Sequence, residues 1–84
     1  MTKKLFPNGT SNYNRITKAL EALITFGYLI EKIEVSSDFY PIIEEKLDSD
    51  GLFFGANVSK INPDYSCVYF YPENSTMAFF IELK

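Results

Sequence analysis

The chain has 84 residues and a net charge of −3, and 46% of its residues are hydrophobic, among them eight Phe and six Tyr. This length suits one small domain over residues 1–84 and excludes a two-domain enzyme. The apolar content is too high for intrinsic disorder, so we expect a fold with a dense aromatic core. The absence of His removes the commonest general base and the commonest metal ligand near neutral pH.

A cytoplasmic location is predicted from the cysteine content and from the pattern of apolar residues. Cys67 is the only cysteine of the chain, so no intramolecular disulfide can form. After Lys4 the apolar run ends at Pro7, which is too early for a signal peptide. Charged residues interrupt the most hydrophobic region, so no transmembrane helix is expected.

Charge is unevenly distributed along the chain. Residues 1–32 carry a net charge of +3, and residues 33–84 carry −6. The cations of the first segment are too dispersed for the basic stripe that is typical of nucleic-acid binding. We therefore interpret the bias as uneven surface charge and do not expect nucleic acid as the partner.

A long helix followed by a strand is predicted at the start of the chain. Thr10 to Asn12 offer N-cap side chains, and Gly27 suits a left-handed C-cap, so the helix should end near Phe26. Residues 28–35 combine β-branched residues with partial alternation, which favours a strand, and a helix continued to Ile33 is the alternative. The apolar positions of the helix recur at three- and four-residue spacing: Tyr13, Ile16, Leu20, Leu23 and Ile24.

A second, short helix is predicted after a capping cluster, Ser36 to Asp38. Pro41 fits its first turn, where the missing N–H costs nothing. The acidic turn 48–51 should end it. Its apolar side would consist of Phe39, Ile43 and Leu47.

From Leu52 onward the sequence predicts a three-stranded antiparallel meander. Residues 52–58, 65–71 and 76–83 alternate in polarity and are separated by turn residues. A four-residue loop would pair Tyr71 with Thr76, Phe70 with Met77 and Val68 with Phe79, and Phe54 would oppose Phe70. The core face would hold Phe54, Ala56, Val68, Phe70, Met77, Phe79, Ile81 and Leu83. The predicted fold is thus a single α+β domain with an N-terminal helix packed on an antiparallel sheet.

The same registers gather aromatic residues on the opposite face of the sheet, with Cys67 among them: Phe53, Tyr65, Tyr69, Tyr71 and Phe80. Tyr69 would lie opposite Gly55. Such a face requires a cover, which is either the short helix or a partner, namely another protein or a second copy of the chain. A nucleic-acid stacking platform would need interleaved Lys and Arg, which are missing.

Residues 15–23, followed by Phe26-Gly27-Tyr28, resemble the recognition helix and first wing strand of winged-helix regulators. The resemblance implies DNA binding through Arg15 and Lys18. The two helices that come before the recognition helix in that family have no counterpart here, and the acidic remainder of the chain would repel phosphate. DNA-binding regulation is therefore the alternative hypothesis.

No motif indicates catalysis. The sequence lacks a Gly-rich phosphate loop, a paired-cysteine motif and a nucleophile elbow. Cys67 is interpreted as a packing residue, and the acidic residues of 44–50 as solvated and too few to bind calcium. We predict a protein without enzymatic activity, cofactor or metal. It would be a cytoplasmic regulator or inhibitor that binds a protein surface, of the kind carried by phages and other mobile elements.

Overall fold

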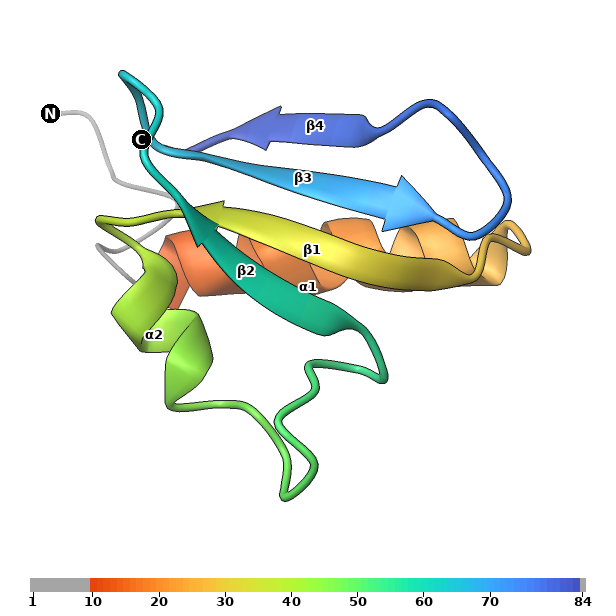
Figure 1. Cartoon of the computed structure of the whole chain (residues 1–84), viewed down its shortest axis with the longest axis horizontal. Helices are drawn as coiled ribbons and strands as arrows, with labels where there is room; N and C mark the ends of the chain where they lie inside the picture. The colour runs from red at the N-terminus through yellow and green to blue at the C-terminus, as the bar shows by residue number, and fades with distance from the viewer. Residues whose placement is uncertain (1–9, 84) are drawn as a thin grey trace, which may run out of the picture.

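The structure is a computed structural model that describes residues 10–83. The segment around Lys4 and Pro7 lies outside this range. Neither helix in the described part of the chain is both long and apolar enough to cross a lipid bilayer. The elements form an α+β arrangement (Figure 1): α1 (Thr10–Thr25), β1 (Ile30–Ser36), α2 (Tyr40–Glu44), β2 (Asn57–Ile61), β3 (Cys67–Pro72) and β4 (Phe79–Glu82).

The end of α1 confirms the prediction from Gly27. This glycine adopts a φ of 101°, in the left-handed region. The Tyr28 N–H donates to the Leu23 carbonyl at 3.0 Å, and the Gly27 N–H donates to the Ile24 carbonyl at 2.9 Å. These two bonds form a Schellman motif, which satisfies carbonyl groups at the helix end and turns the chain into β1. The predicted strand is therefore confirmed, and the alternative of a continued helix is wrong.

The sheet has the strand order β2-β1-β3-β4 and is mixed rather than purely antiparallel (Figure 1). β1 is parallel to β2 and antiparallel to β3. The predicted meander is therefore wrong in its first hairpin, because β2 pairs with β1 instead of β3. Parallel pairing requires a crossover connection, which residues 37–56, including α2, provide. Alternation within a strand identifies its two faces but not its neighbour.

The second predicted hairpin forms with a shifted register. Phe70 pairs with Phe79 and Val68 with Ile81, whereas the prediction paired them with Met77 and Phe79. The shift is two residues, so the side chains of β4 stay on their predicted faces. Met77, predicted on the core face, is wrong, because it precedes β4 and is 53% exposed. The connection is longer than the predicted four residues because β4 begins only at Phe79, although β3 extends one residue further than predicted, to Pro72.

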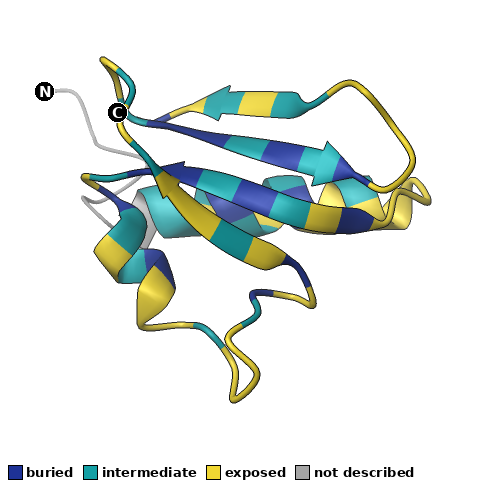
Figure 2. Ribbon diagram, in the orientation of Figure 1, coloured by how far each residue is buried: buried dark blue, intermediate teal, exposed yellow. Residues whose placement is uncertain are grey.

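One face of the sheet is covered by α1 (Figure 1). Ile43 of α2 and Phe39 before it join the same core as the side chains of α1, so α2 does not cover the other face. Buried and partly buried residues alternate from Ile33 to Val35 of β1 and from Val68 to Pro72 of β3 (Figure 2). The buried core includes Ile16, Leu20, Ile33, Val35, Ile43, Phe53, Ala56, Val68, Phe70 and Leu83.

Neither Phe53 nor Phe54 lies where it was predicted: Phe53, predicted to face away from the helix, lies in the core, and Phe54, predicted in the core, lies outside it. Phe53 is 2% exposed and packs against Tyr13 of α1, with ring centroids 6.1 Å apart, whereas Phe54 is 50% exposed. The cause is a two-residue turn at Phe54 and Gly55, closed by two hydrogen bonds between Phe53 and Ala56. Both turn residues have positive φ, as in a type I′ turn. The turn interrupts the predicted strand, so the alternation of side chains does not determine on which face of the sheet each of the two rings lies.

The predicted capping of α2 is wrong, although Pro41 does lie in its first turn. The N-cap residue is Phe39, and no side chain caps the helix. The polar side chains expected there bond to the start of β3: Ser36 Oγ accepts from the Cys67 N–H at 3.1 Å, and the Asp38 carboxylate accepts from the Ser66 hydroxyl. In α1, Thr10 to Asn12 were predicted to cap the helix but lie within it, because α1 already includes Thr10.

Candidate functional site

The sheet face turned away from α1 carries four aromatic side chains, which we call the aromatic face: Tyr65, Tyr69, Tyr71 and Phe80. β3 places Tyr69 and Tyr71 on this face because they are two residues apart, and β4 places Phe80 opposite Tyr69. The ring centroids of Tyr69 and Phe80 are 5.0 Å apart, those of Tyr65 and Phe80 5.9 Å, and those of Tyr69 and Tyr71 6.4 Å. The four rings therefore form one continuous cluster.

The aromatic face is open to solvent. Tyr65 is 45% exposed and Phe80 44% exposed, and the rings between them are half-buried. No element of residues 10–83 lies over this face, which is the one toward the viewer in Figure 1. Four of the five residues predicted to share a face thus do so, and Phe53 lies in the core instead. Tyr69 lies opposite Glu34 of β1 rather than opposite Gly55.

Hydrogen bonds hold the tyrosine rings in place. The Tyr71 hydroxyl donates to Glu34 Oε1 at 2.6 Å, and this bond raises the pKa of Tyr71 to about 12. The hydroxyls of Tyr65 and Tyr69 are bonded at 3.3 Å, which raises the pKa of Tyr65 to about 12. Lys32 Nζ lies 3.5 Å from Glu34 Oε2 and 4.9 Å from the Tyr71 ring centroid. Tyr71 is therefore held by neighbours on β1, and Tyr65 and Tyr69 hold each other.

Cys67 lies at the edge of the aromatic face and is buried. Burial raises the pKa of its thiol, and the nearby carboxylates of Asp38, Glu82 and Glu34 raise it further. A buried thiol that holds its proton is a poor nucleophile. The geometry agrees with the interpretation of Cys67 as a packing residue.

A polar pocket of about 220 Å³ lies next to Tyr65. Hydrogen bonds from the hydroxyls of Ser66 and then Ser36 lower the pKa of Asp38, so this group is a carboxylate at neutral pH. Within residues 10–83, no group of three or more His, Cys, Asp or Glu side chains lies close enough together to hold a metal ion. The lining residues are Ser36, Ser37, Asp38, Pro63, Asp64, Tyr65 and Ser66.

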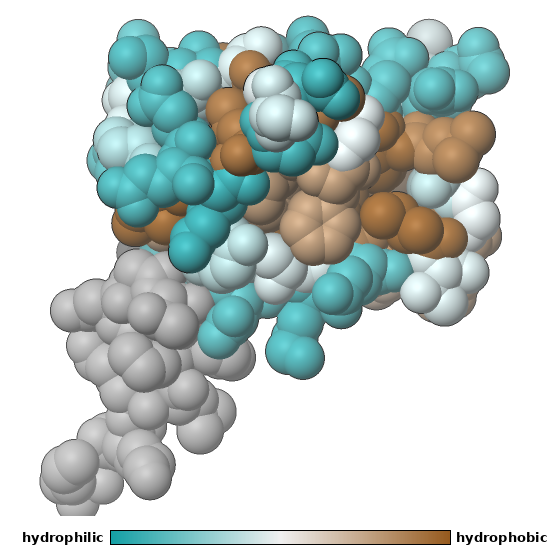
Figure 3. Space-filling view, turned by 90° about the horizontal axis from the view of Figure 1, so that it is seen from below, coloured by the Kyte–Doolittle hydropathy of each residue, from teal (hydrophilic) through white to brown (hydrophobic). Residues whose placement is uncertain are grey.

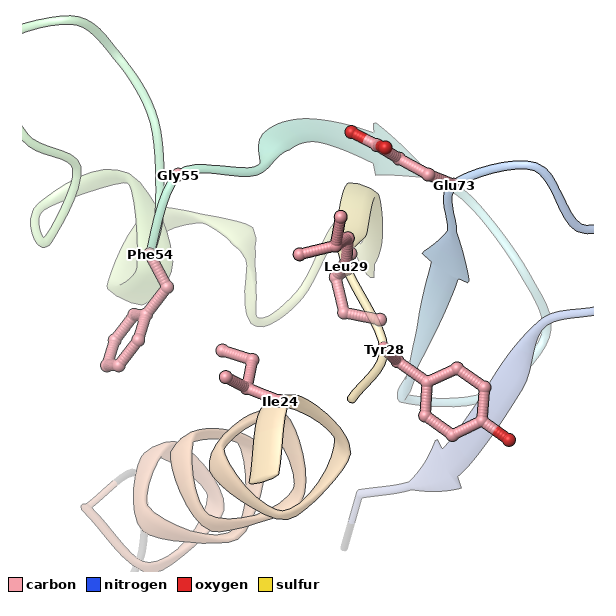
Figure 4. Close-up of a pocket in the computed structure, with 7 residues that line it drawn as sticks. Ile24, Tyr28, Leu29, Phe54, Gly55 and Glu73 are labelled. Atoms are coloured by element: carbon pink, nitrogen blue, oxygen red, sulfur yellow. The ribbon is translucent and has the colours of Figure 1, made fainter. Parts of the chain in front are cut away.

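A second apolar surface lies at the C-terminal end of α1. We call it the turn pocket, because Phe54 projects into it from the type I′ turn. Ile24 and Leu29 point into the pocket, and Phe54 faces Ile24 (Figure 4). Its volume is about 250 Å³. Apolar side chains gather in a hollow between the sheet and α1 when the molecule is viewed from below (Figure 3). Ile24, predicted to face the core, is thus exposed.

The basic residues of the alternative hypothesis lie on α1, away from the aromatic face. Lys18 is exposed and Arg15 half-buried. β1, which follows this helix, is an interior strand between β2 and β3. DNA binding through Arg15 and Lys18 stays a prediction.

Sequence reasoning missed the carboxylates around the aromatic face. Glu34 comes from β1, Asp38 from the turn after it, and Glu82 from β4. The polar side of the predicted strand 28–35 could have indicated them. Placing that side next to the aromatic face, however, requires knowing that β1 pairs with β3. The turn pocket was missed because Phe54 was assigned to the core.

Comparison with protein-family models, curated proteins and solved structures finds no match to this chain.

Proposed function

We propose that the protein is a non-catalytic binding module that attaches to another protein through the aromatic face. The observation that carries the proposal is the continuous cluster of Tyr65, Tyr69, Tyr71 and Phe80 on a sheet face that no element of residues 10–83 covers. Tyrosine is enriched among the residues that dominate binding energy at interfaces.

The fixed positions of the rings support this proposal. Binding costs free energy wherever mobile side chains become ordered, roughly 0.5–1.5 kcal/mol for each one immobilised. Tyr71 is already bonded to Glu34, and Tyr65 to Tyr69. A partner that docks here therefore orders little of this surface.

A role as a cytoplasmic regulator or inhibitor follows from this mode of action. A small domain that binds without catalysis acts by occupying a surface of its partner. The single cysteine favours a reducing compartment. The richness in Asn, Lys, Ile, Tyr and Phe favours a source with an AT-rich genome, such as a phage or another mobile element.

The test is co-purification of the full chain from a native extract, with the bound protein identified by mass. Tyr69→Ser combined with Tyr71→Ser should abolish the capture. These side chains lie outside the core, so circular dichroism should show a folded protein. Light scattering on the same samples measures self-association.

Phe26→Ser combined with Phe54→Ser is the matched control, because it also removes two exposed rings. This control should retain the partner. If instead the control loses the partner and the tyrosine double variant keeps it, the binding site is the turn pocket and the proposal is wrong.

A further inference from the structure

The aromatic face is surrounded by negative charge. Glu34, Asp38 and Glu82 all lie close enough to Cys67 to act on its thiol electrostatically. Asp64 lines the polar pocket together with Asp38. These groups come from four separate segments of the chain.

Among residues 10–83, the basic side chains either pair with a carboxylate on the aromatic face or lie away from this face. On this face, Lys32 already pairs with Glu34 at 3.5 Å. Lys46 lies over the Tyr13 ring and Lys60 over the Tyr40 ring, both beside the helices. The aromatic face therefore combines exposed rings with carboxylates that outnumber its cation.

We infer that the partner of the aromatic face is a basic protein segment, whose arginine side chains stack on the tyrosine rings and pair with the surrounding carboxylates. This inference rests on the proposed function and specifies the chemistry of its partner. Guanidinium is planar, so it stacks on aromatic rings and also bonds to a carboxylate through two N–H groups. Complementary charge across an interface selects the partner and speeds its association.

The polar pocket gives one cationic side chain a defined position. Its lining residues include the acidic Asp38 and Asp64 and the polar Ser37 and Tyr65. Its volume of about 220 Å³ is several times that of a water molecule, so the end of an arginine side chain fits. Because Tyr65 also belongs to the aromatic face, a single segment can fill the pocket and lie across the rings.

A second copy of the chain does not meet these requirements through the same face. A two-fold dimer places each surface against itself. Glu34, Asp38 and Glu82 of one copy would then face the same carboxylates of the other. Like charges brought together oppose association, so the face favours a different, basic protein over a symmetric dimer.

The test uses a fluorescent oligo-arginine peptide as the probe and follows its anisotropy against the full chain. We expect binding that weakens as salt rises, that is stronger than for an oligo-lysine peptide of equal length, and that is absent for oligo-glutamate. Combining Glu34→Gln, Asp38→Asn and Glu82→Gln should weaken binding roughly tenfold or more, because each substitution removes a charge while leaving a hydrogen-bond acceptor.

Glu21→Gln, Glu44→Gln and Glu45→Gln together form the control. They cause the same change in net charge at exposed positions on α1, at the last residue of α2 and directly after it. This control should weaken binding less than about threefold, since exposed charges at a distance are screened by salt.

Several outcomes would overturn the inference. These are no binding of oligo-arginine by the wild type, equal binding of oligo-lysine, equal losses in the two triple variants, or a wild-type symmetric dimer that Tyr69→Ser with Tyr71→Ser dissociates. The last outcome leaves the proposed function intact, because the face would then bind a second copy. Capture of the native partner unchanged by the tyrosine double variant would instead refute the proposed function itself.

Discussion

The covered and the open face of the sheet are built from alternate residues of the same strand, β3, yet their chemistry differs. Val68 and Phe70 face α1 and are fully buried, whereas Tyr69 and Tyr71 face the other way and are only half-buried. The tyrosines of the open face carry hydroxyl groups: that of Tyr71 donates to Glu34, and that of Tyr69 is bonded to the hydroxyl of Tyr65. The comparison teaches that ring area alone does not mark a core. A tyrosine ring can lie at a partly solvent-exposed surface because its hydroxyl group forms hydrogen bonds there.

The largest effect is expected from truncation on the covered face. Phe70→Ala should lower the free energy of unfolding by about 3–5 kcal/mol, since it leaves a cavity among fully buried side chains. This approaches the whole stability of a small domain. Tyr69→Ala, its neighbour on the open face, should cost far less. Urea unfolding of both variants checks the comparison, and equal losses would mean that the open face is a second core.

Phe53 and Phe54 allow the same comparison at a turn. Phe53→Ala should cost about 3 kcal/mol or more, because the ring is buried against Tyr13. Phe54→Asn should instead raise the midpoint of thermal unfolding, because Asn tolerates the left-handed φ of 53° better than Phe does. The expected gain is about 1 kcal/mol. A loss of stability in Phe54→Asn would show that the contacts of the Phe54 ring stabilise the fold by more than its left-handed backbone destabilises it.

The smallest effect concerns the tyrosine hydroxyls at alkaline pH. Tyr65 and Tyr71 ionise near pH 12 in the folded chain, against about 10 in the unfolded chain. Between these values the unfolded chain has lost protons that the folded chain keeps, so stability should fall as pH rises through this window. Near-ultraviolet absorbance of phenolate measures the ionisation. In Tyr71→Phe one of the two late steps should vanish, and if both persist neither of them belongs to Tyr71.

Local patterns were sufficient for the helix and for the faces of β3 and β4. The spacing of Ile16 and Leu20 placed α1 on the core, and Gly27 marked its end, because helix packing and capping depend on neighbours within one or two turns. The faces of Tyr69, Tyr71 and Phe80 followed from the period of two. They were unaffected by the register error between β3 and β4, since that error was an even number of residues.

Only the tertiary structure decided which strands are neighbours, and the candidate site depends on that decision. Pairing of β1 with β3 placed Glu34 beside Tyr71 and Lys32 beside the same ring. The crossover through α2 placed β2 on the far side of β1. The turn at Phe54 and Gly55 placed Phe53 in the core and left Phe54 exposed. Strand order is set by competition among long-range contacts across the whole chain, and alternation within one strand carries no information about which of them prevails.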